Sequence, residues 1–268
     1  MILLRHRSRS GARRLTHPGV ALDMGSARTR AWIAGRGLIL DVPTVTFPGA
    51  GAIHPIQRGT IIDAPGTARM LQRLLAHRLP RLARPLIVVA APVLDGFAYR
   101  SQAHTAVQAL RPRSVLTVPS ARAIAHAAGA DLSRPLLVID IGAHLTEVTL
   151  LADGAVHDAR RAALGTDDTR NQTTGPAQIG EALADMTASM LRQDRTCLTS
   201  DALARGPLLA GGGALHPDIT YRLADRLHVP LRPVPAPHTA AVRGAAQLLK
   251  AVHTHPTTAH TNPSDPPR

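Results

Sequence analysis

The sequence predicts an α/β fold made of two similar halves. Short runs rich in Val, Ile and Leu alternate with stretches of helical periodicity, as in folds with buried strands. A strand–turn–strand pattern also occurs twice, and its equivalent aspartates, Asp23 and Asp140, lie 117 residues apart. Near the end of the chain, an apolar strand runs into three consecutive glycines and then a helix. Two similar halves that face each other would place two equivalent turns across one cleft.

The predicted elements follow the chain in this order. Apolar runs bounded by turn residues predict strands near 18–24, 29–35, 38–46, 85–91, 114–118, 135–141, 145–151, 155–162, 207–210 and 229–234. Helical periodicity predicts helices near 66–79, 98–110, 119–129, 176–193, 217–227 and 238–251, with Pro119 and Pro217 at first turns that tolerate proline. The polar segment 165–175, GTDDTRNQTTG, is predicted to be a loop.

The ends of the chain differ in composition from the middle. We expect residues 1–17 to form a flexible basic arm and residues 252–268 to form a disordered Pro- and Thr-rich tail. The tail histidines, His253, His255 and His260, lack carboxylate neighbours that would complete a metal site, so they are interpreted as solvated. Residues 18–113, with part of the closing C-terminal helix, would form the first lobe, and residues 114–251 would form the second.

Composition limits the possible functions. The formal net charge is +13, which favours loose association with anionic membranes or nucleic acid, but aromatic residues make up only 2% of the chain. Specific nucleic-acid recognition is therefore not expected, because aromatic stacking platforms are nearly absent. The single cysteine, Cys197, excludes an intramolecular disulfide and suits a reducing compartment. The longest apolar run, 85–94, is too short to span a bilayer, so a cytoplasmic location is expected.

The repeated turn has a composition that suits phosphate binding. It occurs in GVALDMGSARTRAWIAGRGLILDVP and again in LLVIDIGAHLTEVTLLADGAVHDAR, where Gly25 corresponds to Gly142. Glycine lets the backbone approach closely, so that successive N–H groups converge on an anion, and Ser26 would add a hydroxyl donor. A Mg²⁺ ion that bridges phosphates needs only one or two protein carboxylates, which Asp23 and Asp140 would supply. Alternatively, Asp and Gly at the end of a hairpin serve only the turn.

The glycine corner lies in GPLLAGGGALHPDITYRLADRL, where Gly211, Gly212 and Gly213 separate a strand from a helix. Such a corner lets a flat ring or a phosphate lie against the backbone near a helix N-terminus. A flexible turn is the plainer interpretation, but three consecutive glycines lose much conformational entropy on folding. The corner therefore indicates a close approach to the backbone.

In their order, these segments resemble the actin, Hsp70 and sugar-kinase superfamily, and within it the MreB/Mbl-like bacterial actins. The two repeated turns are similar to the phosphate hairpins of that family, and LLAGGGAL is similar to its adenosine loop. The connecting segments RGTIIDAPGTARMLQRLL, RPLIVVAAP and VPSARAIAHAAGA and the closing PAPHTAAVRGAAQLL also resemble it, from about residue 18 to residue 250. The resemblance implies an actin-like ATPase fold, in which two ribonuclease-H-like lobes flank a nucleotide cleft.

The resemblance also implies a ligand, ATP with Mg²⁺, and a set of contacts. The implied metal ligands are Asp23 and Asp140. The implied nucleotide contacts are Asp23, Gly25, Ser26, Ala27, Gly142, Ala143, His144, Gly211, Gly212, Gly213 and Ala214.

The chain departs from the family pattern in three places. Only 13 residues separate Val45 from Gly59 and only 40 separate Gly165 from Gly206, where the relatives carry the insertions that form the outer subdomains. Both outer subdomains are therefore expected to be reduced or absent. Val118 stands where an acidic residue positions the attacking water, and valine can neither orient nor deprotonate water. The second turn has Ala143 and His144 in place of glycines.

These features predict a shortened MreB/Mbl-like scaffold of cell shape or cell-wall synthesis, with weak or no ATP hydrolysis. Its expected partners are nucleotide, a full-length MreB/Mbl relative or wall-synthesis proteins, with peripheral membrane contact through the basic arm. The alternative is an active ATPase or small-molecule kinase of the same superfamily. That alternative requires a carboxylate near the γ-phosphate, and Asp63, Asp95 and Asp167 are the unassigned candidates.

Overall fold

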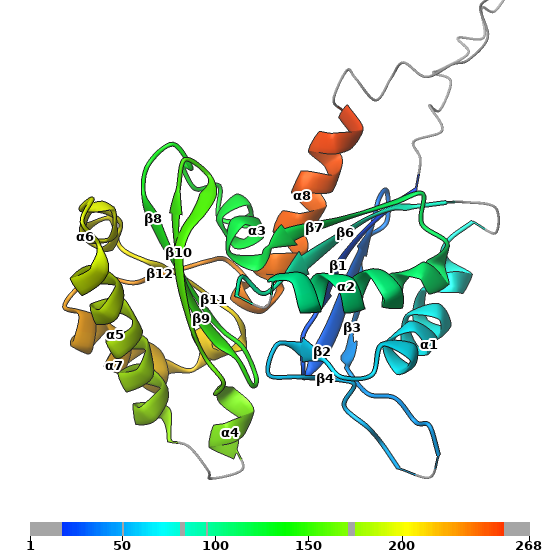
Figure 1. Ribbon diagram of the computed structural model, residues 1–268, viewed down its shortest axis with the longest axis horizontal. Helices are drawn as coiled ribbons and strands as arrows, with labels where there is room; N and C mark the ends of the chain where they lie inside the picture. The colour runs from blue at the N-terminus through cyan, green and yellow to red at the C-terminus, as the bar shows by residue number, and fades with distance from the viewer. Residues whose placement is uncertain (1–17, 50, 81–83, 95, 171–174, 255–268) are drawn as a thin grey trace, which may run out of the picture.

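The computed structural model describes residues 18–49, 51–80, 84–94, 96–170 and 175–254 (Figure 1). The predicted arm, the tail from residue 255 onward and Asp95 lie outside these residues, as does the side chain of His253. Within the described ranges, two five-stranded sheets form the centres of two lobes that lie side by side (Figure 1). The α/β prediction is therefore confirmed.

The two sheets repeat one topology. The first has the order β3-β2-β1-β6-β7, formed by Gly37–Pro43, Arg28–Ile33, Gly19–Met24, Leu86–Ala91 and Ser114–Pro119. The second has the order β10-β9-β8-β11-β12, formed by Ala155–Ala162, Thr146–Ala152, Leu136–Ile141, Leu208–Ala210 and Arg232–Pro233. In each sheet the first three strands of the chain are antiparallel, and the next two are added in parallel on the other side. The internal repeat seen in the sequence is thus a repeat of the fold.

Strand β7 corrects the predicted boundary between the lobes. The prediction began the second lobe at residue 114, but β7 pairs with β6 along its whole length, from Ser114 opposite Leu86 to Pro119 opposite Ala91. These backbone hydrogen bonds tie the strand to the first sheet. The first sheet therefore extends to Pro119.

Helices cover the sheets in three layers (Figure 1). The outer face of the first sheet packs on α1 and α2, which span Ala64–Leu75 and Gly96–Val107. Between the two sheets lie α3 and α8, which span Ser120–Ala127 and Ala240–Thr254. The outer face of the second sheet packs on α5, α6 and α7, which span Pro176–Gln193, Leu198–Ala204 and Pro217–Leu227. The middle helices join the lobes because their apolar side chains share one core with both sheets.

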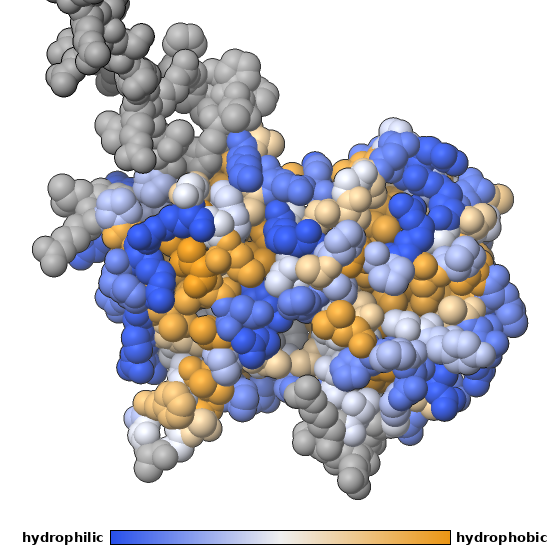
Figure 2. Space-filling model, turned by 180° about the vertical axis from the view of Figure 1, so that it is seen from behind, coloured by the Kyte–Doolittle hydropathy of each residue, from blue (hydrophilic) through white to orange (hydrophobic). Residues whose placement is uncertain are grey.

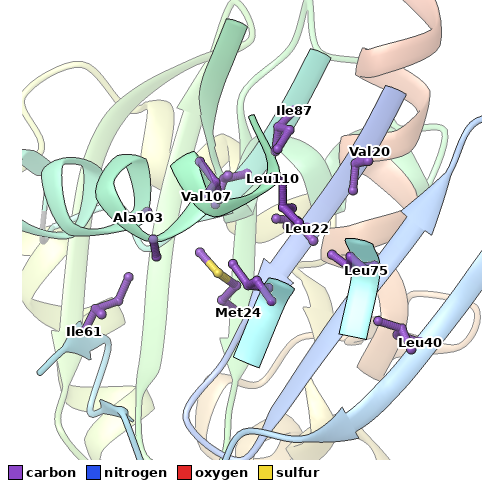
Figure 3. Close-up of a cluster of buried hydrophobic side chains, with 14 of the residues drawn as sticks. Val20, Leu22, Met24, Leu40, Ile61, Leu75, Ile87, Ala103, Val107 and Leu110 are labelled. Carbon is purple, nitrogen blue, oxygen red and sulfur yellow. The ribbon is translucent and has the colours of Figure 1, made fainter. Parts of the chain in front are cut away.

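Alternation along the central strands decides which residues face the space between the lobes. In β1, Val20, Leu22 and Met24 point into the outer core with Leu75 of α1 and Val107 of α2 (Figure 3). Ala21 points the other way, into the core shared by the two lobes. Because successive side chains of a strand point to opposite faces, Asp23 lies on the same face as Ala21. By the same rule, Asp140 of β8 lies on the face of Leu136 and Val138, which belong to the shared core.

Two segments, 45–59 and 165–206, stand where the relatives carry outer subdomains, and both are short in this chain. Between β3 and α1, the described residues form a bridge from Thr46 to Ile53 and a hairpin of β4 and β5, Ile56–Gln57 and Thr60–Ile61. The predicted loop 165–175 is partly wrong, because Thr166–Arg170 forms the short helix α4. Helix α6 was not predicted. The shortened form of the fold is thus present, with small remnants in place of the outer subdomains.

Several large apolar side chains are exposed, among them Phe47, Phe97 and Tyr221. On the face shown in Figure 2, apolar patches are divided by hydrophilic side chains on both lobes. Among the described residues, no helix combines the length and the hydropathy that crossing a membrane requires.

Candidate functional site

A cleft of about 630 Å³ lies between the two lobes. Its walls come from the β1–β2 and β8–β9 hairpins, from α3 and α4, and from the loops that follow β11 and β12. Nine of the predicted site residues line it: Asp23, Gly25, Ser26, Ala27, Asp140, Gly142, Ala143, Gly211 and Gly212. The three sequence features are therefore brought together in one place.

Three other predicted residues are not among those that line the cleft. The imidazole of His144 is directed to Asp167, with 3.8 Å between Nε2 and Oδ2. Gly213 is buried against β8, where an added Cβ would lie 2.1 Å from the Cγ2 of Ile141. Ala214 packs against the outer core of the second lobe. Gly213 and Ala214 support the loop, whereas Gly211 and Gly212 form its cleft face.

The two repeated turns have the same backbone geometry. In the first, the N–H of Gly25 donates to the carbonyl of Arg28 at 3.0 Å, and in the second the N–H of Gly142 donates to that of Leu145 at 2.9 Å. The threonine that follows each turn is fully buried. The hydroxyl of Thr29 is 2.9 Å from that of Thr44, and the hydroxyl of Thr146 donates to the carbonyl of Leu164 at 2.9 Å. The equivalence predicted from sequence therefore extends to the residues that anchor each turn.

The glycine corner closes around the second turn. Gly211 has a φ of +83°, in the left-handed region that favours glycine, and its N–H donates to the carbonyl of Pro237 at 3.1 Å. A Cβ on this residue would lie 2.2 Å from the carbonyl oxygen of Ile141 and 2.5 Å from the Oδ1 of Asp140. Glycine is therefore required here because the backbone lies directly against Asp140.

In the first lobe, the cleft carboxylate is paired with a guanidinium group. Asp23, Arg30 and Asp41 are directly opposite one another on β1, β2 and β3. The Nη1 of Arg30 is 3.5 Å from the Oδ2 of Asp23, and its Nε is 3.3 Å from the Oδ1 of Asp41. Burial raises the pKa of Asp23, and Arg30 opposes that rise. Burial also acts to raise the pKa of Asp41, but hydrogen bonds and charge from Arg28 and Arg30 hold it below its usual value.

In the second lobe, the equivalent positions hold two carboxylates. Asp140 on β8 is directly opposite Glu147 on β9, and both line the cleft. Burial, together with the negative charges of Glu147 and Asp23, raises the pKa of Asp140 to about 7. The Oε1 of Glu147 also accepts a hydrogen bond from the N–H of Val93, at 3.0 Å, and so links the second sheet to the first lobe.

Several cleft residues were not identified from the sequence: Arg30, Tyr99, Glu147, Thr166, His216 and His238. Arg30 and Glu147 are themselves 117 residues apart, so they occupy equivalent positions in the second strand of the repeat. Tyr99 is buried in α2, and its hydroxyl donates to the carbonyl of Met24 at 3.1 Å, a contact that no local pattern indicates.

The magnesium ion that the resemblance implies can be tested against these residues. The Asp23 carboxylate already has a cationic partner in Arg30, whose guanidinium also acts on Asp140. In the described part of the chain, no group of three or more His, Cys, Asp or Glu side chains is arranged to hold a metal ion. Because a metal ion that bridges phosphates needs only one or two carboxylates, the fit is decided at Asp23, where the Arg30 guanidinium already stands in the place of a cation.

The candidate carboxylates for catalysis have different positions. Asp63 caps α1, because its Oδ1 accepts from the N–H of Gly66 at 2.7 Å. Asp167 of α4 lines the cleft. Val118 is packed against the core between the lobes and is not among the cleft-lining residues. Of the two candidate carboxylates that the structure describes, Asp63 and Asp167, Asp167 is the one that lines the cleft.

The β4–β5 hairpin contacts the second lobe across the cleft. From its turn, the Nη2 of Arg58 lies 3.0 Å from the Oδ1 of Asp168, and its Nη1 donates to the carbonyl of Ala163. The carboxylate of Asp168 also accepts from the N–H of Gly165 at 2.8 Å, so it fixes the start of α4. The remnants of the two outer regions thus bridge the cleft.

Several known proteins are similar to this chain in sequence and in fold. A family model described as MreB/Mbl protein matches residues 46–174. Cell shape-determining protein MreB from Escherichia coli (strain K12) is 23% identical, over 88% of this chain and 94% of that protein. That alignment spans 328 residues, more than the 268 of this chain, so the relative carries additional internal segments.

Two solved structures have the same architecture. The crystal structure of MreB5 of Spiroplasma citri bound to ADP has a TM-score of 0.78 and 16% identity, covering 89% of this chain and 98% of that one. The MamK double helical filament has a TM-score of 0.71 and 14% identity, covering 87% and 98%. In sequence and in its actin-like ATPase fold, the chain is thus similar to MreB-like proteins of the actin family, in a shortened form.

Proposed function

We propose that the chain is an actin-like cytoskeletal protein of cell shape that binds a nucleotide in the cleft between its lobes. One observation carries the proposal: both glycine turns and the Gly211 loop line a single cleft. The similarity to MreB, named as cell shape-determining, and to an MreB5 bound to ADP supports it. A role as a scaffold for wall synthesis, beside a full-length relative, is a further part of the proposal.

The proposed contacts follow the cleft walls. Ser26 and Ala27 would bind phosphate through their backbone N–H groups from the first lobe, and Ala143 from the second. Gly25 and Gly142 would let the phosphate approach the backbone closely, since their own N–H groups close the turns. The adenosine would lie against Gly211 and Gly212. His144, Gly213 and Ala214 are left out of this set because they are not among the residues that line the cleft.

We propose that hydrolysis is weak or absent. Val118 has no group that can orient or deprotonate water, and it packs in the core between the lobes. Magnesium is not part of this proposal, since Asp23 is already paired with Arg30.

An active ATPase or small-molecule kinase is the second candidate, because Asp167 and Glu147 give the cleft two carboxylates near the second turn. Phosphate release from ATP separates the two candidates. We expect titration calorimetry to detect binding of ADP and ATP while release stays close to the rate without protein. Sustained release that is abolished in Asp140→Ala would overturn the scaffold proposal in favour of the enzyme.

Peripheral membrane contact through residues 1–17 is a separate proposal, supported by the basic composition of that segment. Flotation with anionic liposomes tests it. Binding that is lost when residues 1–17 are deleted is the expected result, and binding that is unchanged by the deletion would contradict it.

A further inference from the structure

Arg30 is a buried cation in the phosphate region of the cleft. It lines the cleft beside Asp23, and its side chain is only 13% exposed. Its charge acts on three carboxylates: Asp23 and Asp41, each within 3.5 Å, and Asp140, where it opposes the rise in pKa. Its charge therefore lies among the carboxylates that a divalent cation would otherwise neutralise.

The Arg30 guanidinium also has unused hydrogen-bonding capacity. Its Nε is buried and makes no hydrogen bond, although Asp41 is within ion-pair distance. This buried Nε lies beside Asp41 and cannot itself reach a ligand, but the Arg30 side chain lines the cleft. A guanidinium group matches the oxygens of a phosphate with paired donors, so a phosphate is the ligand class that Arg30 suits.

Neighbouring strands hold Arg30 in place. Asp23 and Asp41 are its cross-strand partners on both sides, and Arg28 holds Asp41 in turn, with its Nε 2.5 Å from the Oδ1. The guanidinium is therefore positioned before any ligand arrives, and little side-chain entropy remains to be lost on binding.

We propose that Arg30 is a built-in counter-cation for a nucleoside diphosphate or triphosphate, so that this protein binds nucleotide without a divalent metal ion. The inference rests on the proposed function, because it requires that the cleft bind a nucleotide. In this arrangement the positive charge of Arg30 reduces the repulsion between the phosphates and the carboxylates of the cleft. A bridging metal ion has this role in other nucleotide sites.

Titration calorimetry with ADP, in the presence of either excess Mg²⁺ or EDTA, tests the inference. For the wild-type chain we expect the two dissociation constants to agree within about threefold. Arg30→Gln should weaken binding in EDTA by about tenfold or more, as expected for a lost charge-assisted hydrogen bond. Mg²⁺ should recover part of that loss, because the Asp23 carboxylate is then free. Arg30→Lys keeps the charge and should retain most of the affinity in EDTA.

Arg36→Gln is the matched control. It removes the same charge from the turn after β2, where Arg36 is exposed and donates to the carbonyl of Arg78 at 2.9 Å, and it should leave ADP binding unchanged. The thermal midpoint of each variant without ligand verifies folding. Wild-type binding that disappears in EDTA, or Arg30→Gln binding that is unchanged in EDTA, would overturn the inference and leave the proposed function intact. Absence of ADP binding under both conditions would overturn both.

Discussion

The β1–β2 hairpin and the β8–β9 hairpin occupy equivalent places in the two sheets, and the same backbone hydrogen bond closes both turns. Their carboxylates have different neighbours. Across the strand from Asp23 lies Arg30, whereas across the strand from Asp140 lies Glu147. A duplicated backbone can therefore carry opposite charges at one register position: burial raises the pKa of both aspartates, Arg30 opposes the rise at Asp23, and Glu147 adds to it at Asp140.

The difference also extends to the enclosure of each aspartate. Asp140 lies directly against Gly211, where no side chain would fit, and burial together with the charges of Glu147 and Asp23 raises the pKa of Asp140 to about 7. Asp23 is buried too, but Arg30 opposes the rise. In the first lobe the cleft carboxylate, Asp23, is therefore paired with a cation. In the second lobe the cleft carboxylate, Asp140, titrates near neutral pH. Three predictions test this difference, beginning with the largest expected effect.

The largest effect is expected from adding a side chain at Gly211. Gly211→Ala would place a Cβ against the Ile141 carbonyl and the Asp140 carboxylate at a positive φ, so we expect the free energy of unfolding to fall by about 3 kcal/mol or more. Denaturant unfolding measures this loss. Gly212→Ala is the control, because a Cβ there has no neighbour within 4 Å. Equal stability of the two variants would show that the loop does not enclose Asp140.

A smaller effect is expected from the proton on Asp140. Its pKa of about 7 in the folded chain exceeds the ordinary value of 3.8, so the native state binds a proton more tightly than the unfolded state. Its contribution to stability is therefore greatest at low pH, falls as pH rises from about 4 to about 7, and levels off above that. The slope is at most about 1.4 kcal/mol per pH unit.

Asp140→Asn isolates this contribution, because the amide carries no titrating proton. Urea unfolding of wild type and variant across this pH range should give curves that diverge as pH rises, with the variant relatively more stable at neutral pH. A stability difference that is constant with pH would contradict the raised pKa. Asp23→Asn is the matched comparison from the first lobe, and it should lose the Arg30 ion pair instead.

The strands of the two hairpins and their two aspartates could be predicted from the sequence. Strand positions followed from apolar runs, and the aspartates followed from the repeat, because both are local patterns. The charge pairs were missed because they depend on register between strands, which becomes visible only when Arg30 is placed opposite Asp23. The membership of β7 was missed for a related reason: the order of parallel strands is a property of the whole sheet.

Short helices were also beyond the sequence patterns. Helix α6 begins after Cys197, which has a φ of +61°. The carboxylate of Asp194 accepts from the N–H of Thr199 at 2.6 Å, so a side-chain cap rather than hydrophobic periodicity marks the start of this helix. Helix α4 has the polar sequence TDDTR, and it is held by the carboxylate of Asp168 and by Arg58 from the other lobe. Helix α4 thus depends on a tertiary contact, whereas α6 depends on a side-chain cap from the preceding segment.

The smallest effect is expected at the residue after each turn glycine, where the first hairpin has Ser26 and the second has Ala143. Ser26 is buried and lines the cleft, so its hydroxyl can donate to a phosphate where Ala143 cannot. We expect Ser26→Ala to weaken ADP binding by about fivefold, measured by titration calorimetry. Ala143→Ser makes the second turn like the first and should strengthen binding by a smaller factor. If Ser26→Ala binds as well as wild type while Ala143→Ser binds more tightly, the phosphates lie closer to the second hairpin than to the first.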